Sequence, residues 1–295
     1  MKKKGCFDLN DTSGENASAA PSRQSADKQI RPNGDTAPEH KPAENENIIR
    51  AIARGFDVLR AFRPSDNFLS HSQIVERTGL PGPTVTRILH TLQVLRYVST
   101  HESAKLYRLH PHLLSLGYPV LARFNIRQIA RPIMQELANY SRATVALGVR
   151  DGAEMIYVER ARDKTVVTAH PLDIGSRMPV ATSAQGRAWL AGQPSWTLVE
   201  ILQDLSVYYP SGWQQIKAGI ERSLELYRDN GYVASLGEWE AATNAVGAPV
   251  FLSDGTCLAL TCGGPSHRIQ PKMIEDLGRR TADLAEQISL LDTGS

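Results

Sequence analysis

Five polar or basic side chains fall within one short segment of the chain: Thr84, Thr86, Arg87, His90 and Thr91. An arginine guanidinium can form paired hydrogen bonds to a guanine edge, and a threonine offers a hydroxyl to bases or phosphates and a methyl group to thymine. If one helix carried the set on its exposed face, that helix could read the major groove of DNA. The same residue types also occur on ordinary surface helices, so the surrounding elements must show whether this helix binds DNA or is only a surface helix.

A helix over residues 83–95 is predicted to carry this set. Pro83 suits a first helical turn, because its missing N–H would be unpaired there in any case. The free N–H groups and partial positive charge of that turn would also favour a phosphate. The opposite face is apolar and predicted to be buried through Val85, Ile88, Leu89, Leu92 and Leu95.

Two further helices and a hairpin are predicted around this helix. Apolar residues at three- to four-residue steps predict a helix that ends before Pro64; they are Ile48, Ile52, Phe56, Leu59 and Phe62. Ser70 with Gln73 is typical of a capping box, and Gly79 of a helix end. Residues 97–100 and 105–109 resemble two short strands around a polar turn. Helix, helix, short turn, helix and hairpin is the layout of a winged helix-turn-helix.

The distribution of charge supports a nucleic-acid module in this segment. Residues 48–110 hold nine Lys or Arg against four Asp or Glu, a net charge of +5, whereas the whole chain carries +2. Such a confined basic block is an electrostatic footprint of nucleic-acid binding, although a basic surface can also be merely solvated. Lys105 and Arg108 on the presumed wing are placed for backbone or minor-groove contacts. Ser72, on the preceding helix, completes the candidate DNA-binding set.

The rest of the chain predicts a tail, a connector and a second domain. Residues 1–47 are rich in polar residues and lack apolar periodicity, so we expect them to be disordered. Residues 111–140 predict connecting helices, with a break or kink near Pro119. Residues 141–292 alternate strands and helices, with Asp-Gly turns at Asp151 and Asp254, which predicts an α+β domain. One of its strands is expected at residues 164–170.

Several of these segments together resemble the IclR family of bacterial transcription regulators. Residues 50–62 resemble its opening helix, and residues 74–107 its helix-turn-helix and wing. Residues 175–191, GSRMPVATSAQGRAWLA, resemble its ligand loop, and residues 247–269 its terminal strand hairpin. The resemblance implies a homodimer, often paired into a tetramer, and a GAF-like effector domain that binds a small metabolite. Many members control catabolic operons, and aromatic acids are frequent effectors.

The candidate effector-binding residues are Met178, Thr182, Ser183, Trp239, Cys257 and Cys262. A metabolite pocket is mostly apolar, with a few polar groups that fix orientation, and a carboxylate would suit the helix N-terminus that follows residue 183. Thr182 or Ser183 could equally cap that helix, and Trp239 could serve the core. A buried Cys262 could act simply as a small apolar residue.

Two alternatives to a sensor remain for the second domain, a thiol enzyme or redox sensor and a pure dimerisation platform. GAF-like folds include thiol reductases, but the five-residue separation of Cys257 and Cys262 would place them on opposite faces of one strand. We therefore expect no enzyme, no cofactor and no metal site. Expected partners are a double-stranded DNA operator, a small effector such as an aromatic carboxylate, a second copy of the chain and RNA polymerase. Three cysteines without a disulfide framework, no long apolar run and no signal peptide predict the cytoplasm.

Overall fold

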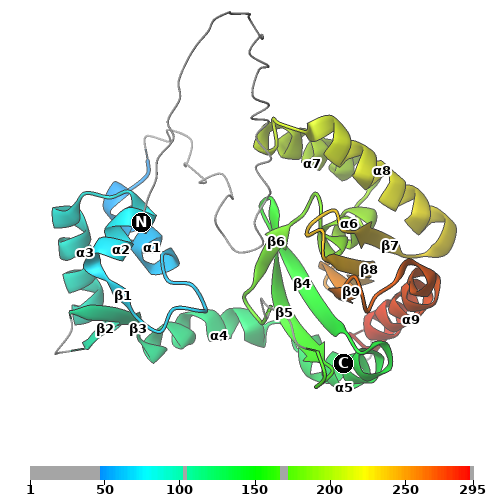
Figure 1. Cartoon of the computed structure of the whole chain (residues 1–295), viewed down its shortest axis with the longest axis horizontal. Helices are drawn as coiled ribbons and strands as arrows, with labels where there is room; N and C mark the ends of the chain where they lie inside the picture. Colours follow the sequence, from blue (N-terminus) through cyan, green and yellow to red (C-terminus); the bar gives the residue numbers. More distant parts are fainter. Residues whose placement is uncertain (1–46, 102–104, 167–171, 293–295) are drawn as a thin grey trace, which may run out of the picture. The chain divides into compact units, whose positions relative to one another are not determined.

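The computed structural model describes residues 47–101, 105–166 and 172–292 (Figure 1). Apart from Asn47, the predicted disordered tail lies outside these ranges, as do residues 102–104 of the presumed wing. None of the helices in the described ranges combines the length and the apolar character that crossing a bilayer requires.

The N-terminal part is built from three helices and a small antiparallel sheet (Figure 1). The helices are α1 (Arg50–Arg60), α2 (His71–Thr78) and α3 (Gly82–Val94). The strands are β1 (Leu69–Ser70), β2 (Val98–His101) and β3 (Leu106–Leu109), in the order β1-β3-β2. Their shared core comprises Val58, Leu69, Ile74, Val85, Leu89, Leu92 and Val98. These elements form the predicted winged helix-turn-helix.

Local signals set the bounds of these helices as predicted. The backbone N–H of Gln73 donates to the Ser70 hydroxyl, while the Ser70 N–H donates to the Gln73 side chain at 2.8 Å, so the capping box of α2 is confirmed. Gly79 ends α2 with a φ of 64°, a conformation that costs glycine little. Pro83 lies in the first turn of α3, as expected.

The predicted buried stripe of α3 needs one correction, and the apolar face of α1 is only partly covered. Leu95 is 52% exposed, because it is the C-cap of α3 and lies beyond the helical stripe. Ile52 and Phe56 are 56% and 50% exposed, because α1 packs mainly through its C-terminal half, where Val58 is fully buried and Leu59 packs against the core. The apolar periodicity predicted this helix correctly, but it did not show which half of the helix packs against the rest of the domain.

The C-terminal part contains a six-stranded antiparallel sheet in the order β6-β5-β4-β9-β8-β7. Its strands are β4 (Thr144–Asp151), β5 (Glu154–Arg162), β6 (Arg177–Pro179), β7 (Val233–Leu236), β8 (Thr243–Phe251) and β9 (Cys257–Pro265). Gly152 and Gly255, in the two Asp-Gly turns, have φ of 63° and 83°, which confirms the predicted hairpins. Thus the second domain is α+β, as predicted.

Helices cover both faces of this sheet and create two cores. One core joins the sheet to α5 (Ile126–Ser141) and α9 (Ile274–Asp292). The other joins it to α6 (Ala184–Ala191), α7 (Ser195–Tyr208) and α8 (Trp213–Asn230) (Figure 1). The remaining helical segments are η1 (Pro111–Leu113), α4 (Leu114–Ala122) and η2 (Pro271–Met273). Pro119 and Pro132 lie inside α4 and α5, so neither helix ends at its proline.

One predicted strand is wrong in the part that can be seen. Lys164 and Thr165 form a turn and Val166 is not in a strand, while residues 167–170 lie outside the described ranges. The edge strand β6, Arg177–Pro179, was not expected. Three residues are too few to show an alternating pattern, which explains why this strand has no clear sequence signal.

Candidate functional site

Helix α3 presents most of the polar set on the face opposite its core stripe. Thr86, Arg87, His90 and Thr91 are exposed, and Thr84 is half-buried. No hydrogen bond or ion pair among the described residues holds the guanidinium of Arg87 or the ring of His90. Both side chains are therefore available as donors to a ligand on this face.

The threonine hydroxyls of α3 are already engaged with the helix backbone. Thr86 Oγ1 donates to the carbonyl of Gly82 at 3.0 Å, and Thr91 Oγ1 donates to the carbonyl of Arg87 at 3.0 Å. Their protons are thus used, and the Thr86 oxygen also lies 3.0 Å from His71 Nε2. The Thr91 oxygen and the two methyl groups remain for contacts. This shifts hydrogen-bond donation on α3 towards Arg87 and His90.

His71 positions the two helices and was not singled out from sequence. Its Nε2 lies 3.2 Å from the carbonyl oxygen of Gly82 and 3.0 Å from Thr86 Oγ1, so one ring connects the start of α2 to the first turn of α3. Nothing in the sequence pattern connects residues 11 and 15 positions apart.

The strands and α2 place the remaining DNA-binding candidates. Arg108 is exposed on β3, donates from Nε to Ser99 Oγ at 3.2 Å and lies over the Phe68 ring with a guanidinium-to-centroid distance of 5.6 Å. Lys105 is exposed in the turn before β3 with a φ of 48°. Ser72 is exposed on α2, its hydroxyl 3.0 Å from that of Ser70.

Arg77 has a structural role, although it contributes to the basic block. Its guanidinium pairs with Asp66 and donates to the carbonyl of Ala61 at 2.8 Å. The hydrogen bond from Arg77 lowers the pKa of the Asp66 carboxyl. This pair ties α2 to the loop after α1, so its charge is largely compensated within the protein.

In the second domain, Thr182 and Ser183 lie at the N-terminus of α6. Ser183 is the N-cap, because its hydroxyl accepts the Gly186 N–H at 3.0 Å. The side chain of Thr182 is buried, and its carbonyl accepts the Ser235 hydroxyl at 2.8 Å. Met178 on β6 is buried in the core between the sheet and α6, α7 and α8, and Trp239 packs against that core.

The two cysteines lie apart from this group and from each other. Cys262 is fully buried in the core that faces α5 and α9, on the opposite side of the sheet from α6. Cys257 lies at the other end of α6, since a Cβ placed on Gly192 would be 2.7 Å from its sulfur. Burial raises the pKa of Cys257 to about 12 and that of Cys262 to about 11. The expected opposite faces are observed, and both thiols are poor nucleophiles.

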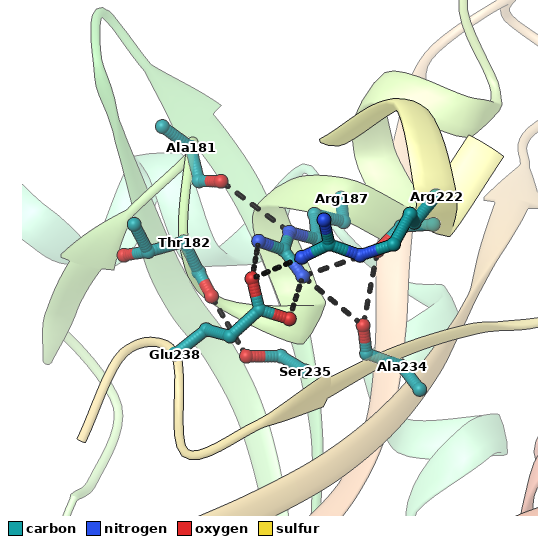
Figure 2. A network of polar contacts seen from close by, with 8 residues as sticks. Ala181, Thr182, Arg187, Arg222, Ala234, Ser235 and Glu238 are labelled. Carbon is teal, nitrogen blue, oxygen red and sulfur yellow. Dashed lines mark hydrogen bonds and ion pairs between the residues drawn. The ribbon is translucent and has the colours of Figure 1, made fainter. Parts of the chain in front are cut away.

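A buried ion pair fixes α6 against its neighbours and was missed from sequence (Figure 2). Arg187 is 1% exposed, and its two terminal nitrogens donate to the carboxylate oxygens of Glu238 at 2.7 and 2.6 Å. The guanidinium also donates to Ser223 Oγ at 3.1 Å and to the carbonyls of Ala181 and Ala234. The side chain of Arg187 therefore connects α6 to α8, to β7 and to Glu238, which follows β7.

Gln185 is a second polar side chain that sequence reasoning missed. It is 1% exposed, and its Nε2 donates to the carbonyl of Ala259 on β9 at 3.2 Å. Within the part of the chain that the structure describes, no three His, Cys, Asp or Glu side chains are grouped so as to hold a metal ion.

Comparison with known proteins identifies both parts. The family model described as "Bacterial transcriptional regulator IclR C-terminal" matches residues 118–290, and that of the "IclR helix-turn-helix domain" matches residues 51–102. The HTH-type transcriptional regulator KipR of Bacillus subtilis is 30% identical over 83% of this chain and 96% of its own. The p-hydroxybenzoate hydroxylase transcriptional activator of Acinetobacter baylyi is 26% identical over 78% of this chain and 87% of its own.

A solved structure agrees with these matches. The crystal structure of an IclR family transcriptional regulator from Brucella abortus shares 37% identity over 84% of this chain and 94% of that chain, with a TM-score of 0.71. Fold, sequence and helix-turn-helix point to the same conclusion: the chain belongs to the IclR family of bacterial transcription regulators, and it is a DNA-binding regulator rather than an enzyme.

Proposed function

We propose that this regulator binds an operator through α3 and its wing, and that a small organic acid, in particular an aromatic carboxylate, binds its second domain and changes its DNA affinity. The observation that carries the DNA-binding half is the exposed, uncommitted pair Arg87 and His90 on α3, in the same domain as the exposed wing residues Lys105 and Arg108. The regulated genes would then be a catabolic operon for that acid. Because its target is the chromosome, we expect the protein to act in the cytoplasm.

The class of effector is supported by a relative and by the N-terminus of α6. The Acinetobacter relative is named as the activator of p-hydroxybenzoate hydroxylase, an enzyme of aromatic acid metabolism. Among the described residues, no hydrogen bond uses the backbone N–H of Ala184 or Gln185 in the first turn of α6. Free N–H groups at a helix N-terminus favour a carboxylate. Thr182 and Ser183 adjoin this turn, and Met178 lies in the core on the same face of the sheet. We leave Cys262 out because it lies on the other face of the sheet.

Two copies of the chain would place two α3 helices in successive major grooves. A helix-turn-helix dimer reads two half-sites about one helical turn apart, and its operator mirrors the two-fold symmetry. The effector must bind the DNA-competent and incompetent arrangements with different affinity, since otherwise it shifts nothing. A dimer or tetramer, and contact with RNA polymerase, are part of this proposal.

Replacement of Arg87 by alanine tests base reading by α3. If Arg87 forks onto a base, Arg87→Ala should reduce the specific affinity by about 1–3 kcal/mol and leave non-specific binding nearly unchanged. Fluorescence anisotropy with DNA from upstream of the gene and with a scrambled duplex gives both affinities. Arg279→Ala is the matched control, because Arg279 is an exposed arginine of α9 in the other domain. An unchanged ratio of specific to non-specific affinity would remove Arg87 from this role.

Replacement of Lys105 tests the wing in a different way. A lysine that contacts only phosphate should matter equally for all sequences, so Lys105→Ala should weaken both duplexes alike. The slope of log affinity against log salt should become shallower by about one. An unchanged slope would show that Lys105 does not contact the DNA backbone.

A change in melting temperature on adding 4-hydroxybenzoate separates a sensor from a pure dimerisation platform. A ligand that binds only the folded state raises the melting temperature in a concentration-dependent way. No change with this or related acids would favour the dimerisation role for the second domain.

A further inference from the structure

The side chain of Gln185 packs directly against the backbone of β4 at a glycine, where any other residue would clash with it. Its side chain crosses Gly148 of β4, where an added Cβ would lie 2.3 Å from Gln185 Nε2 and 2.9 Å from its Oε1. Gly148 pairs with Ala259 on β9 and with Tyr157 on β5. Gln185 is the second residue of α6, and its side-chain amide therefore lies against the middle of the sheet.

The contacts fix which end of this amide is which. Nε2 donates to the carbonyl of Ala259 at 3.2 Å, and turning the amide over would place two acceptors against each other. Oε1 is therefore the end of the side-chain amide that is not bonded to Ala259. It is buried, and it has no hydrogen-bond partner among the described residues. A buried acceptor without a donor has lost its hydrogen bonds to water and gained none in return.

Neighbouring polar groups on this face do not supply the missing donor. Burial raises the pKa of Tyr157 to about 12, so it stays a neutral phenol, and no hydrogen bond joins its hydroxyl to Gln185 Oε1. Thr261 Oγ1 donates to the carbonyl of Ala146 at 3.4 Å. Two other buried side-chain atoms in the described ranges lack partners, Arg127 Nε and Glu240 Oε1. Like Gln185, both belong to groups that are held through another atom, Arg127 by Glu159 and Glu240 by Thr243.

We propose that Gln185 selects the effector: its Oε1 accepts a hydrogen bond from a hydroxyl or N–H group of the bound acid. This inference rests on the proposed function and narrows it, because the second domain then favours hydroxy-substituted aromatic acids over the same acids without a donor. Gln185 supplies complementary groups from one residue, since its backbone N–H suits a carboxylate and its side chain suits a hydroxyl.

The first test uses the full wild-type chain and needs no variant. Calorimetric titrations with benzoate, with 2-, 3- and 4-hydroxybenzoate and with the matching methoxybenzoates compare ligands that differ in one donor. We expect one hydroxybenzoate to bind about tenfold more tightly than benzoate, the value of one net hydrogen bond, and its methoxy counterpart to lose that gain. Equal affinities would overturn the inference and leave a buried water as the partner of Oε1.

The second test uses Gln185→Met, which keeps a similar length and removes the acceptor. We expect this variant to bind benzoate and the preferred hydroxybenzoate with equal affinity and to keep its DNA affinity. A preserved preference would show that another residue reads the hydroxyl and would overturn the inference. If the wild type binds none of these acids yet still binds its DNA, the proposed effector class fails, and the inference fails with it.

Discussion

The buried ion pair between Arg187 and Glu238 gives the sharpest stability prediction. Removing one partner of a buried pair costs about 3–5 kcal/mol, because the other charge is left without compensation. The side chain of Glu238 is 33% exposed, and Gln would keep one acceptor for the guanidinium, so we reduce the expected loss for Glu238→Gln to about 2 kcal/mol. Arg222, 3.7 Å from Glu238 and 65% exposed, adds little.

Thermal unfolding of the full chain measures this loss. For a domain of this size, about 2 kcal/mol corresponds to a melting temperature lower by roughly 4–8 °C. Arg187→Met provides the second arm of a double-mutant cycle. In the Arg187→Met background, Glu238→Gln should cost almost nothing, because no buried cation remains to be compensated, and the difference between the two costs is the coupling.

The pH dependence of the same difference supplies an independent check. The hydrogen bond from Arg187 holds the pKa of Glu238 below its ordinary value of 4.5. A carboxyl with a lowered pKa contributes stability above its unfolded pKa and loses it as the pH falls through its folded pKa. The gap between wild type and Glu238→Gln should therefore be complete at neutral pH and close below pH 4.5. Equal melting temperatures at neutral pH, or a gap that persists in acid, would refute the assigned role of the pair.

Two further predictions separate structural from binding roles in the second domain. Ser183→Ala should lower stability by about 1 kcal/mol through loss of the α6 N-cap, whereas Thr182→Ala should weaken the ligand response more than the fold. Urea unfolding and ligand titration of both variants measure the two effects. A larger loss of stability in Thr182→Ala and a larger loss of ligand response in Ser183→Ala would exchange the two roles. In a Cys6→Ala variant at about pH 8, Cys257 and Cys262 should not react with a thiol reagent until the protein unfolds, because burial raises the pKa of each thiol far above that pH; rapid labelling of the native protein would contradict the buried environment.

Local signals made much of the winged helix predictable. The Ser70 capping box and Gly79 define α2 within a few neighbouring residues, and Asp151 and Asp254 mark their hairpins in the same way. Such signals lie within a few residues of one another, and tertiary packing did not override them. The apolar stripe of α3 was correct for Val85, Leu89 and Leu92 for the same reason.

Contacts between distant segments could not be read in this way. Arg187 pairs with Glu238, 51 positions later, and Gln185 bonds to Ala259, 74 positions later. A buried arginine inside the apolar sequence of α6 is a signal, since a buried charge needs a partner, but it does not identify that partner. The exposure of Ile52 and Phe56 likewise depends on which half of α1 meets its neighbours.

Binding of the purified chain to DNA from upstream of its gene, with and without hydroxybenzoates, tests the central claim most directly. At two salt concentrations, the account predicts specific, salt-sensitive binding to this DNA and a shift in affinity when the preferred acid is added. Binding that is equal for this DNA and a scrambled duplex, and unmoved by any of the acids, would contradict it.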